Sequence, residues 1–103
     1  MKKAMQESRE LGDLVSVGPA TLRDFARLGI ETTQQLAKQD PLVLYQRMCE
    51  LEGKRIDPCL HDVFSAAVAQ ARDPKLPEEQ RKWWYWSTVR KSASGAESKA
   101  QKR

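Results

Sequence analysis

Apolar residues recur at helical spacing along most of the chain, and no stretch alternates apolar and polar residues long enough to predict a strand. The clearest apolar stripe follows Asp57 and comprises Leu60, Val63, Phe64, Ala67, Val68 and Ala71. Further helices are predicted over residues 4–15, 19–28, 32–39 and 41–51, and a sixth begins at Glu78. The pattern therefore predicts an all-α fold of five to six short helices.

Local signals mark where these helices begin and end. Pro19, Asp40-Pro41 and Asp57-Pro58 suit helix starts, because proline lacks the N–H that would be unpaired there and aspartate can cap the free amides. Thr32 to Gln35 has the Thr-x-x-Gln form of a capping box. Gly29 is expected to end its helix in the left-handed conformation.

The charge is unevenly distributed along the 103 residues, which carry 18 Lys and Arg against 14 Asp and Glu. Residues 1–86 hold 13 basic and 13 acidic side chains, so the net charge of +4 comes from residues 87–103. We expect one domain over residues 1–90 and a disordered basic tail over 91–103, because Ser, Ala, Gly, Lys and Gln cannot bury a core. A neutral body weakens the nucleic-acid interpretation that the basic pI suggests.

The segment around Gly18 has the form of a helix, a tight turn and a second helix. Glycine lets a phosphate approach the backbone, and the unpaired N–H groups of a helix start carry a partial positive charge. The sequence predicts that phosphate contacts come from this turn and from cations on the helix after it: Ser16, Gly18, Ala20, Thr21, Arg23 and Arg27.

The order of motifs over residues 11–88 resembles the bacterial pathogenicity locus family. The matching elements are Val17-Gly18-Pro19-Ala20-Thr21, Leu28-Gly29-Ile30, Asp40-Pro41, Leu44-Tyr45, Cys49, Asp57-Pro58-Cys59, Asp62-Val63-Phe64 and the terminal Trp-Trp-x-Trp. Members are described as helix-hairpin-helix proteins, and some carry the label mitomycin resistance protein. The hairpin half is also similar to the C-terminal domain of TfoX-like competence regulators. The resemblance implies a helical domain that binds DNA, without an assigned reaction.

Two positions depart from the strong DNA-binding form of the hairpin. That form has glycine two residues before Gly18, where this chain has Ser16, and Pro19 removes one amide. The alternative interpretation is a plain helix–helix corner filled by Val17, Leu22 and Ile30.

Two further segments have both a functional and a structural interpretation. A second hairpin around Gly53 would place Lys54 and Arg55 near the start of the next helix, where an anion is favoured, unless this is an ordinary solvated loop. The aromatic run from Trp83 to Trp86 suggests base stacking, but Trp83 and Trp86 share one helix face and are expected to cover the core. Trp84 diverges from that face and is available for contact.

No enzyme, metal or cofactor site is predicted. Cys49, Cys59 and His61 fit no zinc spacing, and the two cysteines are expected to be small core residues, although a thiolate at Cys59 would be stabilised by the helix start. His61 lies in no catalytic triad pattern, and Asp40, at the spacing of a glycosylase aspartate, has a plain role as a helix cap.

The sequence favours a non-enzymatic module that binds the DNA backbone without sequence preference, through residues 16–27 with Lys54, Arg55 and the basic tail. The alternative is a protein-interaction adaptor that uses its Trp-rich helix. No small-molecule substrate is predicted. No apolar run is long enough for a membrane span or a secretory signal, so a cytoplasmic location is expected.

Overall fold

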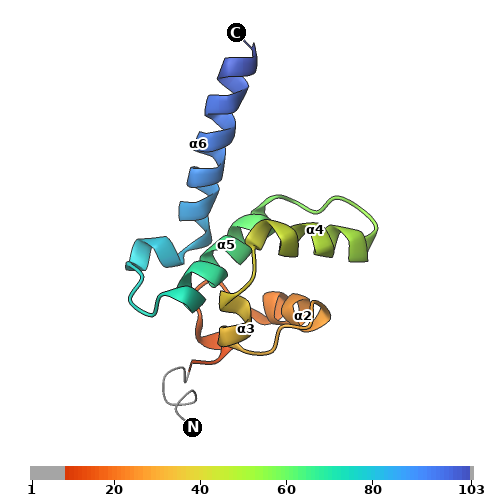
Figure 1. The fold of residues 1–103 in the computed structure, drawn as a ribbon, viewed down its shortest axis with the longest axis vertical. Helices are drawn as coiled ribbons and strands as arrows, with labels where there is room; N and C mark the ends of the chain where they lie inside the picture. Colours follow the sequence, from red (N-terminus) through yellow and green to blue (C-terminus); the bar gives the residue numbers. More distant parts are fainter. Residues whose placement is uncertain (1–8, 103) are drawn as a thin grey trace.

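The computed structural model describes residues 9–102, with side chains over 9–92, and every element in this range is helical (Figure 1). The elements in chain order are η1 Leu11–Asp13, α2 Pro19–Arg27, α3 Thr33–Ala37, α4 Pro41–Glu52, α5 Cys59–Arg72, η2 Glu78–Arg81 and α6 Trp83–Lys102. The all-α prediction is confirmed. Within residues 9–102, none of these helices combines the length and apolar composition needed to cross a membrane.

The core is built around α5, the most apolar helix in the sequence pattern. Phe64 on α5 is fully buried and stacks on Phe25 of α2, with ring centroids 5.4 Å apart. Leu36 from α3 and Leu44 from α4 are also fully buried in this cluster. Figure 1 shows α2, α3 and α4 gathered beside α5, while α6 extends away from them. The core therefore fixes α2 and the turn before it against α5.

The predicted helix ends are found where local chemistry places them. Thr32 and Gln35 form both bonds of a capping box, and the Asp40 carboxylate accepts the amide of Leu42 at 2.9 Å. Gly29 has φ +80, and the next residue, Ile30, donates its amide to the carbonyl of Phe25 at 2.8 Å. That pairing closes α2 and turns the chain back into the core.

The prediction of a helix over residues 4–15 is wrong for residues 9–15, the part of this range that the structure describes. Only the single turn Leu11–Asp13 is helical, and Leu14 is already extended. Leu11 and Leu14, three residues apart, both reach the core from this one turn, so a longer helix is not needed to bury them. The chain after Leu14 is held by bonds from α5, described below. Residues 4–8 lie outside the described range.

Three apolar positions are more exposed than the periodicity predicts. Leu22 was expected to be buried with Phe25 and Ala26, but Leu22 and Ala26 are exposed. Without a long first helix beside it, α2 buries only the narrow side that carries Phe25. Leu51, predicted on the inner face of α4, is also exposed, because α4 ends one residue after it and the chain turns away at Gly53.

The last helix begins later than predicted. Glu78–Arg81 forms a separate 3₁₀ turn, and extended backbone at Lys82 divides it from α6. Trp83 and Trp86 are half-buried, as expected of residues that face the body, and Trp84 is exposed. The backbone of α6 extends to Lys102.

A buried ion pair joins α6 to α5. Both oxygens of the Asp62 carboxylate accept hydrogen bonds from the Arg90 guanidinium, at 2.8 and 2.9 Å, and the Asp62 side chain is only 1% exposed. The bidentate geometry satisfies a charge that would otherwise be costly to bury. Arg90 therefore belongs to the folded body and is not available as a tail cation.

Replacing Arg90 by Ala should lower the free energy of unfolding by about 3 kcal/mol, because it leaves the buried Asp62 carboxylate without its partner. Urea unfolding measures this loss. The exposed pair of Arg27 and Glu52 provides the control, since Glu52→Ala should cost only a small part of that amount. Equal losses in the two variants would contradict a stabilising role for the buried pair.

Candidate functional site

The turn predicted to be functional runs from Leu14 to Gly18. The amide of Val17 donates to the carbonyl of Leu14 at 3.2 Å, and the Val17 side chain is buried in the core. Gly18 follows in ordinary extended backbone with φ −103 and is the N-cap residue of α2. The interpretation of this segment as a plain helix–helix corner therefore holds for the buried Val17 side chain. The neighbouring residues Ser16 and Gly18 are only half-buried.

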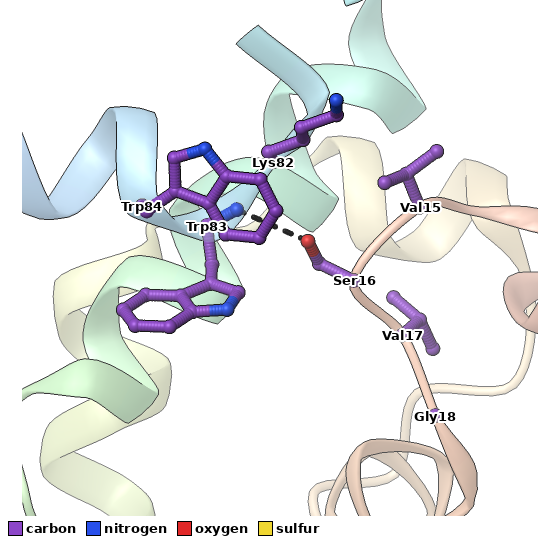
Figure 2. Close-up of a pocket in the computed structure, with 7 residues that line it drawn as sticks. All are labelled: Val15, Ser16, Val17, Gly18, Lys82, Trp83 and Trp84. Atoms are coloured by element: carbon purple, nitrogen blue, oxygen red, sulfur yellow. Dashed lines mark hydrogen bonds between the residues drawn. The ribbon is translucent and has the colours of Figure 1, made fainter. Parts of the chain in front are cut away.

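Ser16 has the left-handed conformation that normally favours glycine, with φ +75. This is the position at which the strong form of the motif has glycine, so serine adopts the same backbone at a conformational cost. Its hydroxyl oxygen accepts the amide of Trp83 at 3.0 Å (Figure 2). The hydroxyl also donates to the carbonyl of Arg81 at 3.3 Å. The side chain therefore ties the turn to the start of α6, which glycine cannot do.

Gln70, a residue that the sequence reasoning did not single out, holds the turn against α5. Its amide is 4% exposed, accepts the N–H of Val15 at 2.9 Å and donates to the carbonyl of Val15 at 2.8 Å. The same NH₂ group also lies 3.3 Å from the carbonyl of Arg81. One buried side chain thus fixes both the turn and the segment before α6. The sequence offered one signal for this role, a polar glutamine next to the apolar stripe of α5.

Three backbone amides at the start of α2 have no hydrogen-bond partner in the part of the chain that the structure describes. They belong to Gly18, Ala20 and Thr21, and no side chain caps this helix. Ala20 is exposed, and Gly18 and Thr21 are half-buried. A Cβ added at Gly18 would meet no heavy atom within 4 Å. The three unpaired donors lie at the positive end of a helix, where an anion is favoured.

The turn and the start of α6 share one hollow of about 510 Å³. Val15, Ser16, Val17 and Gly18 form one side, and Lys82, Trp83 and Trp84 form the other (Figure 2). Lys82 is the charged residue of this lining, and its Nζ lies 5.6 Å from the centre of the Trp84 ring. The two features that the sequence assigned to rival functions, the hairpin and the Trp-rich helix, therefore meet at one surface.

The two predicted cations on α2 differ in their surroundings. Arg27 forms an ion pair with Glu52 of α4 at 2.5 Å, so its charge is locally balanced. Arg23 is exposed and makes no hydrogen bond or ion pair to a residue within 9–92. The nearby carboxyl of Asp24 has a raised pKa, mainly because burial disfavours its charged form. Arg23 therefore remains a candidate phosphate contact, whereas the charge of Arg27 is already paired with Glu52.

The second predicted hairpin does not join the first. Lys54 completes the turn that ends α4, donating its amide to the carbonyl of Cys49, and its side chain lines a separate hollow with Asp24 and Glu52. Arg55 lies beside the Tyr45 hydroxyl, which donates to the carbonyl of Ile56. Because Arg27 and its partner Glu52 lie at the far end of α2, this loop is separated from Gly18 by about 13 Å of helix.

The start of α5 also differs from the prediction for Lys54 and Arg55. Asp57 occupies that helix start, because its carboxylate accepts the amide of Cys59 at 2.9 Å. An anion would meet this negative charge before it met either cation. The position of Asp57 therefore favours the solvated-loop interpretation, and an anion site at Lys54 and Arg55 stays a prediction.

The surroundings of Cys59 and His61 shift the pKa of each side chain. The hydrogen bond with Asp57 raises the pKa of the Cys59 thiol, so the thiolate considered from its place at a helix start is disfavoured. Burial lowers the pKa of His61. Within the described residues, no three His, Cys, Asp or Glu side chains gather as metal ligands would.

The structure is that of a small all-helical protein in which the central helix α5, through Gln70, holds the turn before α2. The chain belongs to the pathogenicity locus family, whose model matches residues 4–92. It is also 42% identical over 85 residues to the mitomycin resistance protein McrB of Streptomyces lavendulae, an overlap of 82% of this chain and 77% of the relative. No solved structure matches the chain. The family resemblance is confirmed, while the likeness to TfoX-like domains stays a prediction.

Because the Ser16 backbone is strained, the alanine and glycine variants at this position should differ in stability. Ser16→Ala loses both hydroxyl bonds and keeps φ positive, whereas Ser16→Gly loses the same bonds but relieves the strain, so the glycine variant should be more stable than the alanine variant by about 1 kcal/mol. Thermal and urea unfolding measure the difference. Gly18→Ala is the control and should be well tolerated, since φ is negative and the space is open. An alanine variant at position 16 as stable as the glycine variant would refute the strained turn.

Proposed function

We propose that the chain is a non-enzymatic cytoplasmic module that binds the sugar-phosphate backbone of nucleic acid at the turn before α2. The observation that carries the proposal is the set of unpaired amides of Gly18, Ala20 and Thr21 beside a hollow lined by Lys82. Backbone N–H groups at a helix start bind phosphate oxygens without reading bases. Binding of this kind is therefore independent of sequence.

The charge distribution indicates which cations assist. Lys82 lines the hollow, and Arg23 lies on the helix that begins there, whereas Arg27, Lys54 and Arg55 are paired or distant. The contact would neutralise only a few phosphates, so affinity should be modest and should fall with salt less steeply than for strongly basic binders. The basic residues after Ser92 add a further, non-specific attraction in this proposal.

The direct test measures the anisotropy of a fluorescent oligonucleotide of random sequence, titrated with the full chain at low salt. Lys82→Glu and Arg23→Glu should each weaken binding by about tenfold, because each places a negative charge beside a phosphate. Lys54→Glu reverses a charge on an exposed side chain away from the turn and should have little effect. Equal losses in all three variants would point to general attraction without a defined site.

A protein ligand remains the alternative, and it is supported by the exposed apolar side chains of the same hollow. Val15 is 38% exposed and Trp84 is 56% exposed. An interface built on these residues would be insensitive to salt. Absence of nucleic-acid binding at low salt would overturn the backbone proposal and favour this alternative.

A second candidate function, resistance to mitomycin, is supported by the identity with a relative that bears this name. Expressing the chain in a mitomycin-sensitive bacterium should raise survival on the drug. Lys82→Glu should reduce that survival if resistance uses the proposed site, and Lys54→Glu serves as the matched charge reversal. Survival no better than with an empty vector would exclude this function for the chain.

A further inference from the structure

We infer that the hollow selects single-stranded nucleic acid, with a phosphate at the turn and an unpaired base stacked on Trp84. The inference rests on the proposed function and specifies its substrate. It depends on the placement of one exposed indole within the same hollow as Gly18 and Lys82 (Figure 2). In a duplex the base faces are covered by their neighbours, so only an unpaired base can use this ring.

Trp84 keeps much of its ring exposed. At 56% exposure it is the most exposed large apolar residue among those that the structure describes, while Trp83 and Trp86 are half-buried. Trp86 donates its indole N–H to the carbonyl of Gln80 at 2.7 Å, whereas no hydrogen bond from the Trp84 indole to the described residues is found. The Trp84 ring meets the Trp83 ring edge-on, with centroids 5.9 Å apart, and its exposed part is accessible to an outside partner.

Different residues of the hollow suit the phosphate, the sugar and the base of one nucleotide. The Gly18 backbone and Lys82 suit a phosphate, while Val15 and the Trp84 ring suit the apolar faces of a sugar and a base. Lys82 Nζ now lies over the Trp84 ring, and a phosphate would attract it more strongly than the ring does. Movement of the ammonium toward the phosphate would uncover the ring face for the base.

The electrostatics also favour stacking as a source of affinity. Residues 1–86 have no net charge, and one lysine supplies the charge of the hollow. A protein that binds by charge alone needs several clustered cations, which this face lacks. A sequence-tolerant stacking contact supplies affinity that does not depend on salt.

The test compares a single-stranded oligothymidylate with a blunt duplex of the same length, using the full chain and fluorescence anisotropy. The wild type should prefer the single strand. Trp84→Ala should weaken single-strand binding by about tenfold and change duplex binding little. Trp84→Phe should restore most of the loss, because phenylalanine keeps a ring for stacking. Val89→Ala, at another exposed apolar position of α6, is the control and should change neither affinity.

The outcomes distinguish failure of single-strand selection from failure of backbone binding at the turn. If Lys82→Glu weakens binding while Trp84→Ala does not, stacking is refuted and backbone binding stands. If Trp84→Ala weakens both oligonucleotides equally, Trp84 contacts the backbone or supports the fold, and strand selection is refuted. If neither oligonucleotide binds at low salt, both proposals fail. Circular dichroism of each variant checks that the helical fold is retained.

Discussion

The buried amide of Gln70 is the constraint on which the rest of the site depends. It accepts and donates at the two backbone groups of Val15 and also reaches the carbonyl of Arg81. These bonds replace the continuation of the first helix, so the chain turns at Val15 and Ser16 before it reaches Gly18. They also set the segment before α6 at a fixed place beside the turn. Without this side chain, two buried backbone groups would lack partners, which is costly in a protein interior.

Ser16 and Asp62 build on the same arrangement from either side. The Ser16 hydroxyl bridges Arg81 and Trp83, and the Asp62 carboxylate holds Arg90 further along α6. Together these contacts attach α6 to the body through polar groups, while Phe25 and Phe64 form the apolar centre. The hollow between turn and helix is thus a product of rigid attachments on both walls. Such preorganisation is what a weakly charged site needs to bind a ligand at useful affinity.

Local features of the fold were predictable from the sequence, and contacts between distant residues were not. The capping box at Thr32, the Asp40 cap and the left-handed Gly29 depend on neighbouring residues, so their chemistry is visible in the chain itself. The helix predicted over residues 4–15 fails because the chain turns after Leu14, where Gln70, 55 residues away, bonds both backbone groups of Val15. The candidate site shows the same division. The turn was found from its glycine, but counting charges missed that Arg27 is paired with Glu52 and that Lys82 and Gly18 line the same hollow.

The central claim is that the amides after the turn bind phosphate, and amide chemical shifts test it most directly. A nuclear magnetic resonance titration of the ¹⁵N-labelled chain with a short oligothymidylate reports each backbone N–H separately. The account predicts saturable shifts at Gly18, Ala20 and Thr21, with the amides of Gly53 and Lys54 unchanged as internal controls. Shifts confined to the residues after Ser92, with none at the turn, would contradict it.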